Sequence, residues 1–137
     1  AIWRDVIEAA PERMFDRILE RFRSGAGIGA ADYVAGWRRL DVLRRLWAAR
    51  TAEYDAVVLP TSPILPPEAR RLMQDHDYYV RENLLALRNT RIGNLMGLCA
   101  ITLPSGTPSC GLMLMGPPGA EEGLLRLAQA AEAAILA

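Results

Sequence analysis

Short apolar runs bounded by Gly or Pro occur three times in this sequence. Two of them, Ala100–Leu103 and Leu112–Met115, flank the segment S-G-T-P-S at 105–109, and the third is Ala56–Leu59. Runs of this length closed by chain-breaking residues are typical of buried β-strands. The segment between the first two predicts a tight connection, in which Gly106 is free to adopt a positive φ.

Helical periodicity occupies most of the remaining chain. Apolar residues recur at spacings of three and four, which predicts helices within 2–7, 12–22, 31–53, much of 68–98 and 120–137. We therefore predict an α/β fold: one mixed sheet covered by helices, with Ala31–Glu53 and Glu121–Leu136 packed against it. In the first of these helices the residues Trp37, Leu40, Leu43 and Trp47 form an apolar stripe that is expected to face the core.

Glycines mark two further features. The run S-G-A-G-I-G at 24–29 follows a helix and lacks the G-x-G-x-x-G spacing, so we interpret it as a helix cap and linker rather than a phosphate-binding loop. Further along, Gly93, Asn94 and Gly97 are expected to interrupt a helical pattern and to let backbones approach closely.

Charge and composition narrow the classes of function. Sixteen basic residues, all Arg, balance sixteen acidic ones, and this neutrality argues against a nucleic-acid partner. No apolar run approaches the roughly 18 residues that span a bilayer, and no signal peptide opens the chain. Two cysteines do not make a disulfide framework. We expect a cytoplasmic protein that binds neither nucleic acid nor membrane.

Reactive side chains are few. His76 lies between Asp75 and Asp77, but no second His or nearby Cys completes a zinc set, so we expect a solvent-exposed histidine and no metal. Cysteine–histidine catalysis would need His76 to meet Cys99 or Cys110, which lie in or beside strands predicted to be buried, where a thiol is inert. The sequence therefore predicts no cofactor and no catalytic residue.

Two segments together resemble a known family. Asn94 begins N-L-x-G-L-x-A-I-x-L-P-x-G, and Gly111 begins G-L-x-L-x-G-P-P, which is followed by a helix. This arrangement resembles the C-terminal end of the amidase signature enzymes. Upstream, Y-D-A-V-V-L-P-T-S-P resembles their strand D-hydrophobic-hydrophobic-P-T-x-P, so the resemblance covers Tyr54–Ala137. Cys99 stands where the commonest version of the motif has Pro.

The resemblance implies an enzyme that hydrolyses amides. In this family a Ser nucleophile, a second Ser in a cis peptide and a Lys base lie in a Gly/Ser-rich N-terminal core, whereas this chain has no Lys and no G-G-S-S-type segment. We predict that 1–137 is a single C-terminal fragment of an amidase domain, helical over 1–53 and mixed α/β over 54–137. Alone it should be inactive, and the full-length enzyme should act on a small-molecule amide.

Candidate substrate-binding residues follow from their positions next to the predicted strands. Thr61 and Ser62 come directly after one strand, a common location for site residues in α/β folds, although a structural turn would also explain them. Thr90, Arg91 and Asn94 precede the next strand and are expected to border the substrate cavity. Arg91 would favour a carboxylate or another acceptor-rich group. The alternative is that Arg91 pairs with a structural carboxylate and Asn94 caps a turn.

Two other functions remain open. One is a free-standing α/β module for interaction or oligomerisation. The other is the A subunit of a tRNA-dependent amidotransferase, a family that generally carries an acidic residue shortly before the motif's Asn, where Leu87-Arg88-Asn89 stands here. For the amidase fragment we expect a homo-oligomer, because the apolar faces Trp3/Phe15/Phe22 or Trp37/Trp47 would have lost the domain that covers them.

Overall fold

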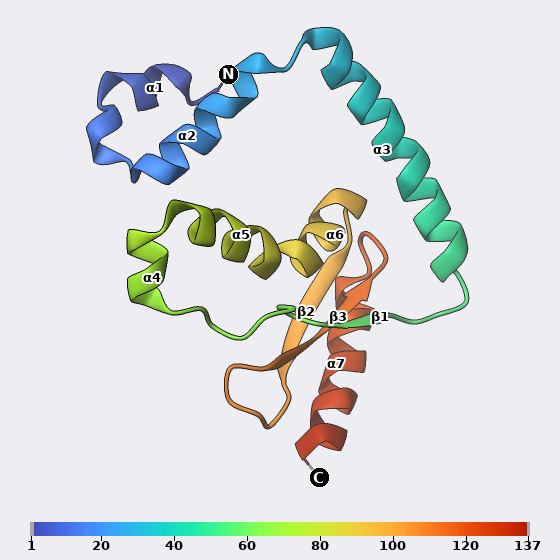
Figure 1. Cartoon of the computed structure of the whole chain (residues 1–137). Coiled ribbons are helices and arrows are strands. Elements are labelled where there is room, and N and C mark those ends of the chain that lie inside the picture. Colours follow the sequence, from blue (N-terminus) through green and yellow to red (C-terminus); the bar gives the residue numbers. More distant parts are fainter. Residues whose placement is uncertain (1, 137) are drawn as a thin grey trace. The chain divides into compact units, whose positions relative to one another are not determined.

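A computed structural model describes residues 2–136 of the chain (Figure 1). The chain divides into two compact units, Ala1–Arg39 and Leu40–Ala137, and each is described by itself. The helix α3 (Ala30–Thr51) begins in the first unit and ends in the second.

The second unit is built around a three-stranded sheet. β1 (Val57–Pro60), β2 (Cys99–Pro104) and β3 (Gly111–Gly116) pair in the order β1-β3-β2. All three predicted strands are confirmed, and Gly106 has the expected positive φ of 77° in the turn between β2 and β3. The pairings of β3 with both neighbours are antiparallel. These three strands therefore form an antiparallel sheet, where a mixed sheet was expected. A turn this short can join only antiparallel strands.

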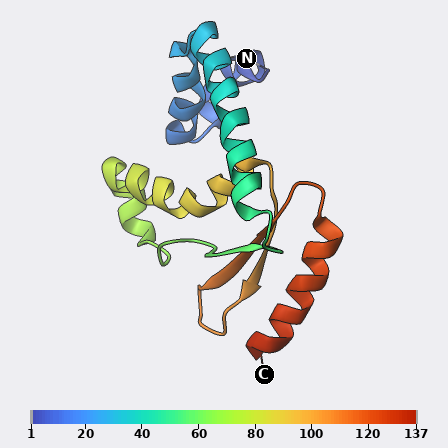
Figure 2. The same cartoon turned by 90° about the vertical axis from the view of Figure 1, so that its right-hand side faces the viewer.

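Helix α7 (Glu121–Leu136) covers one face of the sheet, as predicted (Figure 2). Side chains alternate between the two faces of a strand, and Leu103 and Leu114 lie on the face that meets α7. There they form a buried cluster with Leu124 and Ala128 of the helix. This cluster is the apolar core that holds the sheet and α7 together.

Three consecutive helices lie on the opposite side of the sheet: α4 (Ala69–Gln74), α5 (His76–Ala86) and α6 (Arg88–Met96). Figure 2 shows these helices and α7 on opposite sides of the strands. Gly93 of α6 is buried, and a β-carbon there would lie 3.6 Å from the end of Met115, which is itself 2% exposed. Helix α6 therefore packs directly on β3.

Gly97 ends α6 in the left-handed conformation, with a φ of 74°. The expectation that Gly93 and Asn94 interrupt the helix is wrong, because α6 runs through both. Glycine is a poor helix former, but a helix can contain it where packing of the helix on its neighbours compensates.

The first unit is a small helical assembly: α1 (Arg4–Ala9), a 3₁₀ turn η1 (Pro11–Arg13), α2 (Asp16–Ser24), a second turn η2 (Gly25–Gly27) and the start of α3. The helix expected from residue 12 begins later, since the proline-initiated turn precedes it. The Gly-rich run ends α2 and links it to α3, as predicted. Arg23 and Glu8 form an ion pair at 2.6 Å, and the hydrogen bond from Arg23 lowers the pKa of Glu8.

Helix α3 differs from the prediction in its burial. No side chain of α3 is buried, and Trp37 in the predicted stripe is 46% exposed. Within the second unit the last turns of α3 approach the sheet, where Trp47 is half-buried. The expected burial of the stripe is therefore wrong for the described residues, because an apolar stripe shows only that a helix suits a partner surface and does not supply one.

Candidate functional site

Two threonines from opposite edges of the sheet meet across its central strand. The hydroxyl groups of Thr61, which directly follows β1, and Thr102 in β2 are 3.1 Å apart and hydrogen-bonded. The backbone of Thr61 also donates to the carbonyl oxygen of Gly111 at 2.8 Å, which extends the pairing of β1 with β3 by one residue.

Gly111 makes this bridge possible because it has no side chain. A β-carbon at position 111 would lie 2.8 Å from Cγ2 of Thr102 and 2.9 Å from Oγ1 of Thr61. Both distances are far shorter than an ordinary contact between such atoms. The glycine therefore leaves the space through which the two hydroxyl groups reach one another.

Asn89 joins this end of the sheet to α6, although nothing in the sequence pattern singled it out. Its side chain is 7% exposed and its Nδ2 donates to the carbonyl oxygen of Pro60 at 2.7 Å. Asn89 and Gly93 are four residues apart and thus share one face of α6, and both are buried. The sequence showed only an asparagine four residues before a glycine in a helical pattern, and the burial of both residues becomes visible only in the fold.

The predicted site residues fall around this hydrogen bond. Thr61 follows Pro60 and Thr90 follows Asn89, so the bond places both threonines at one corner of the second unit. Ser62 is exposed and its Oγ accepts a long hydrogen bond of 3.5 Å from the backbone of Ile64, which agrees with a turn. We call the group formed by Thr61, Ser62, Asn89, Thr90 and Thr102 the polar corner.

Arg91 and Asn94 lie on α6 beside the polar corner, and both are exposed. Thr90 and Asn94 are four residues apart and lie on one side of the helix, with Arg91 one turn before Asn94. Within residues 2–136, no hydrogen bond or ion pair joins the side chain of Arg91 or Asn94 to another group. Thr90 is half-buried, and its hydroxyl donates to the carbonyl oxygen of Leu87 at 3.2 Å.

The polar corner does not present an activated nucleophile. The hydroxyls of Thr61 and Thr102 are bonded to each other, and that of Thr90 to a backbone carbonyl. A hydroxyl attacks a carbonyl efficiently only when a positioned base removes its proton. Hydroxyl, amide and guanidinium groups arranged in this way instead suit recognition of a polar ligand.

The two cysteines differ in their surroundings. Cys99 in β2 is half-buried, and its thiol donates to the carbonyl oxygen of Pro117 at 3.1 Å. The expectation that Cys110 is buried is wrong, because it lies at the end of the turn before β3 and is exposed. The sequence around Cys110 resembles a strand, but pairing of β3 with β2 begins only at the next residue, Gly111.

His76 is exposed at the start of α5, as predicted. Asp75 instead caps that helix by accepting from the backbone of Tyr78 at 2.8 Å. This hydrogen bond is the main cause that lowers the pKa of Asp75; desolvation opposes it, and the charge of Arg71 adds a lesser lowering effect.

The described residues offer no metal site and no membrane span. Across 2–136, no three His, Cys, Asp or Glu side chains are grouped so as to hold a metal ion. In the same range, each helix is too short or too polar to cross a bilayer.

Comparison with known proteins gives a consistent family. Residues 1–125 match the family described as Amidase. A 2-amino-5-chloromuconic acid deaminase of Comamonas testosteroni is 35% identical over 130 residues, which are 90% of this chain and 28% of that protein. A fatty acid amide hydrolase of Oryza sativa subsp. indica is 34% identical over 113 residues, 75% of this chain and 18% of that protein.

A third relative is the A subunit of a glutamyl-tRNA(Gln) amidotransferase from Halobacterium salinarum. It is 28% identical over 139 aligned residues, 95% of this chain and 32% of that protein. The chain thus spans about a third or less of the length of these curated relatives. No solved structure matches it.

Proposed function

This chain belongs to the amidase family, and we propose that it forms the C-terminal part of an enzyme that hydrolyses the carbon–nitrogen bond of a small-molecule amide. The chain would supply the sheet, its covering helices and one wall of the substrate pocket. Residues 1–137 would form one piece of an amidase domain.

The catalytic Ser, Ser and Lys of this enzyme would lie outside the chain. The absence of Lys from the sequence supports this, since the family's base is a lysine. The bonding of the threonine hydroxyls at the polar corner also supports it, because those groups are engaged by other threonine or backbone oxygens. On its own the chain should release no ammonia from simple amides.

The hydrogen bond from Asn89 to Pro60 is the observation that most supports the proposed role of this chain as a wall of the substrate pocket. It joins the start of α6 to the end of β1, and these are the segments that hold Thr90, Arg91 and Asn94 on one side and Thr61 and Ser62 on the other. A rigid corner of this kind keeps binding groups in a fixed arrangement, which substrate orientation requires.

Arg91 would select the substrate. Its guanidinium is exposed and, within 2–136, bonded to no other residue, so two parallel N–H groups are available to a carboxylate or another group with two acceptors. The substrate we propose is therefore an amide that carries a carboxylate or a similar acceptor-rich group.

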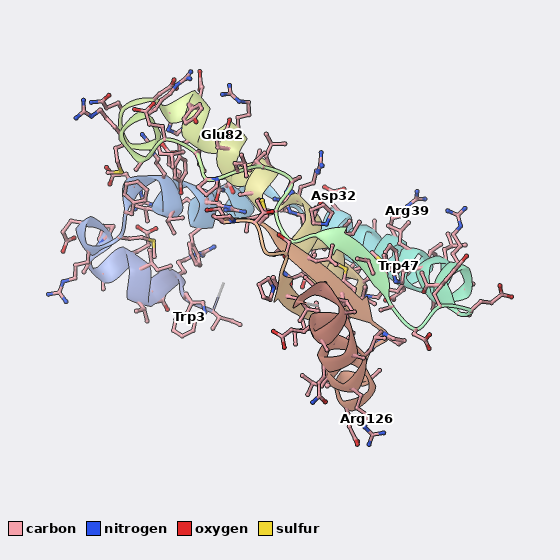
Figure 3. The ribbon with its side chains drawn as sticks, turned by 90° about the horizontal axis from the view of Figure 1, so that it is seen from below. Trp3, Asp32, Arg39, Trp47, Glu82 and Arg126 are labelled. Atoms are coloured by element: carbon pink, nitrogen blue, oxygen red, sulfur yellow. The ribbon has the colours of Figure 1, made fainter. Side chains whose placement is uncertain are left out.

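Replacement of Arg91 in the full-length enzyme tests this role. Arg91→Ala should raise KM for carboxylate-bearing amides at least tenfold and leave KM for neutral amides within twofold, since only the former use the guanidinium. Arg126→Ala is the matched control, because Arg126 (labelled in Figure 3) is an exposed arginine on α7, across the sheet from α6. An unchanged KM for every amide tried would remove the recognition role from Arg91.

The A subunit of a tRNA-dependent amidotransferase is the second candidate. The halobacterial relative carries that name, which supports it. Asn89 argues against this candidate. That family generally has an acidic residue in this region, whereas here the side chain of Asn89 is buried and hydrogen-bonded to the end of β1. Ammonia release from a free amide without tRNA would favour the hydrolase, and glutamine-dependent activity that requires charged tRNA would favour the amidotransferase.

A homo-oligomer would cover the apolar side chains of the first unit. Trp3 is 61% and Phe22 53% exposed, and Leu19 is the buried apolar side chain of that unit among the described residues. Exposed apolar surface on this scale favours association. Light scattering should give twice the chain mass at tens of micromolar. A folded monomer at that concentration would instead support a free-standing module.

A further inference from the structure

An apolar cavity lies in the second unit at the end of the sheet opposite to the polar corner. It measures about 230 Å³ and is bounded by the last turns of α3, the link to β1, the end of α6 and the residues that follow β3. Val57 and Met115, which are paired across β1 and β3, lie in its wall. Trp47 of α3, labelled in Figure 3, forms another part of that wall.

The cavity is distinct from the polar corner. Pro60 and Thr61 are at one end of β1, whereas Val57 is at the other. Along α6, Asn89 and Met96 are seven residues apart, or about 10 Å at the rise of an α-helix. None of the five polar-corner residues contributes to the cavity wall.

Three polar groups in the wall already have partners inside the protein. The Thr51 hydroxyl donates to the carbonyl oxygen of Trp47 at 3.0 Å, and Nε of Arg44 donates to that of Leu95 at 2.8 Å. The carbonyl oxygen of Pro117 accepts from the Cys99 thiol. A ligand meets mainly apolar side chains, and three of the polar groups among them are already engaged, which favours apolar contact over polar recognition.

The side chains in the wall favour a flat aromatic ligand in particular. Trp47 and Tyr54 present ring surfaces, and Met96 and Met115 present thioethers, which contact aromatic rings favourably. The charged groups in the wall are one cation, Arg44, and one anion, Asp55. Their charges cancel, so the wall has no net preference for an ionic ligand.

We propose that this cavity is a binding site for a neutral, flat aromatic molecule of about two fused rings. The size follows from the volume, because an apolar cavity of about 150 Å³ accommodates benzene and this one measures about 230 Å³. The site is separate from the wall proposed for the amide substrate, and binding here does not require the chain to take part in hydrolysis.

Indole is a suitable probe, with Trp47 as the reporter. The sequence has three tryptophans, so the variant Trp3→Phe/Trp37→Phe leaves Trp47 as the source of the only indole N–H signal of the ¹⁵N-labelled protein. Titration with unlabelled indole should move this signal in a saturable way. No saturable shift up to the solubility limit of indole would overturn the proposal.

Filling the cavity tests its location. Ala48→Leu and Ala52→Leu each place a larger side chain in the wall and should weaken indole binding at least tenfold. Ala49→Leu is the matched control on α3, outside the cavity wall, and should leave the Kd within twofold. Far-UV circular dichroism identifies which of the two filling variants are folded. If one of them fails to fold, the other still provides the test. Equal Kd values for filled and control variants would contradict the proposed site.

Discussion

Replacing Asn89 is the sharpest test of how the polar corner is held together. Asn89→Ala removes a hydrogen bond of 2.7 Å to the carbonyl oxygen of Pro60 and empties a site that is 7% exposed. The effect on α6 should be local, since the replaced side chain points to the end of β1. We expect the second unit to fold but with lower stability.

The magnitude follows from three contributions. A neutral hydrogen bond contributes about 0.5–1.5 kcal/mol net to stability. The loss of the buried side chain adds about 1 kcal/mol, the order expected for removing atoms that occupy closely packed space. Alanine regains about 0.5 kcal/mol, because it is the better helix former. Pro60 is exposed, so water can bind its carbonyl oxygen in the variant and reduce the cost of the lost hydrogen bond. The total decrease in the free energy of unfolding is therefore about 1–2 kcal/mol.

Asn94→Ala is the control, since it changes the same residue type on the same helix at an exposed position. It gains the same helix propensity and should change the free energy of unfolding by less than about 0.5 kcal/mol in the stabilising direction. The difference between the two variants isolates the buried hydrogen bond and packing of Asn89 from the shared change in propensity.

Urea unfolding followed by Trp47 fluorescence is the measurement, in the Trp3→Phe/Trp37→Phe background, so that the second unit alone is reported. Asn89→Asp adds a pH test. A buried carboxylate has a raised pKa, so this variant should be most stable below the ordinary Asp pKa and lose stability as pH rises through the raised value. Equal stability of Asn89→Ala and Asn94→Ala would refute the reasoning.

Three further changes give independent expectations. Gly111→Ala should cost about 1–3 kcal/mol, since its β-carbon collides with Thr61 and Thr102, and adding Thr102→Ser should recover part of it in urea unfolding. Gly93→Ala should stabilise α6 by up to about 1 kcal/mol in the same assay, because the new β-carbon makes only ordinary contacts. A loss of stability of more than about 1 kcal/mol would instead show that α6 packs too tightly on β3 for a β-carbon at this position. Asp75→Asn should keep the cap of α5 and remove one part of the acid sensitivity. Because the folded pKa of Asp75 is lowered from 3.8, its stabilisation is present above that value and is lost as pH falls through the lowered one, as acid titrations of helicity on both proteins would show.

Local sequence determined the secondary structure and the family of this chain. The apolar runs closed by Gly and Pro became β1, β2 and β3, because chain-breaking residues restrict the backbone wherever they occur. The left-handed Gly106 follows from the same local sterics. The motifs around Asn94 and Gly111 pointed to the amidase family, which the family comparison confirms.

Tertiary structure decided which side chains meet. Nothing local distinguishes the buried Asn89 from the exposed Asn94, which lie on the same helix. Their difference arises because one faces β1, and a neighbour brought close by folding is not encoded in spacing along the chain. The contact of Thr61 with Thr102 across Gly111 has the same origin, since these residues are far apart in sequence and adjacent only in the sheet.

The exposed stripe of α3 shows the same division. Helical spacing fixed which residues share a face, because that depends only on the geometry of the helix. Burial of that face depends on a second surface, and within the described residues no side chain of α3 is buried. Sequence therefore specified what each element can pack with, and the fold specified what it does pack with, because burial requires atoms from distant segments to occupy the same space.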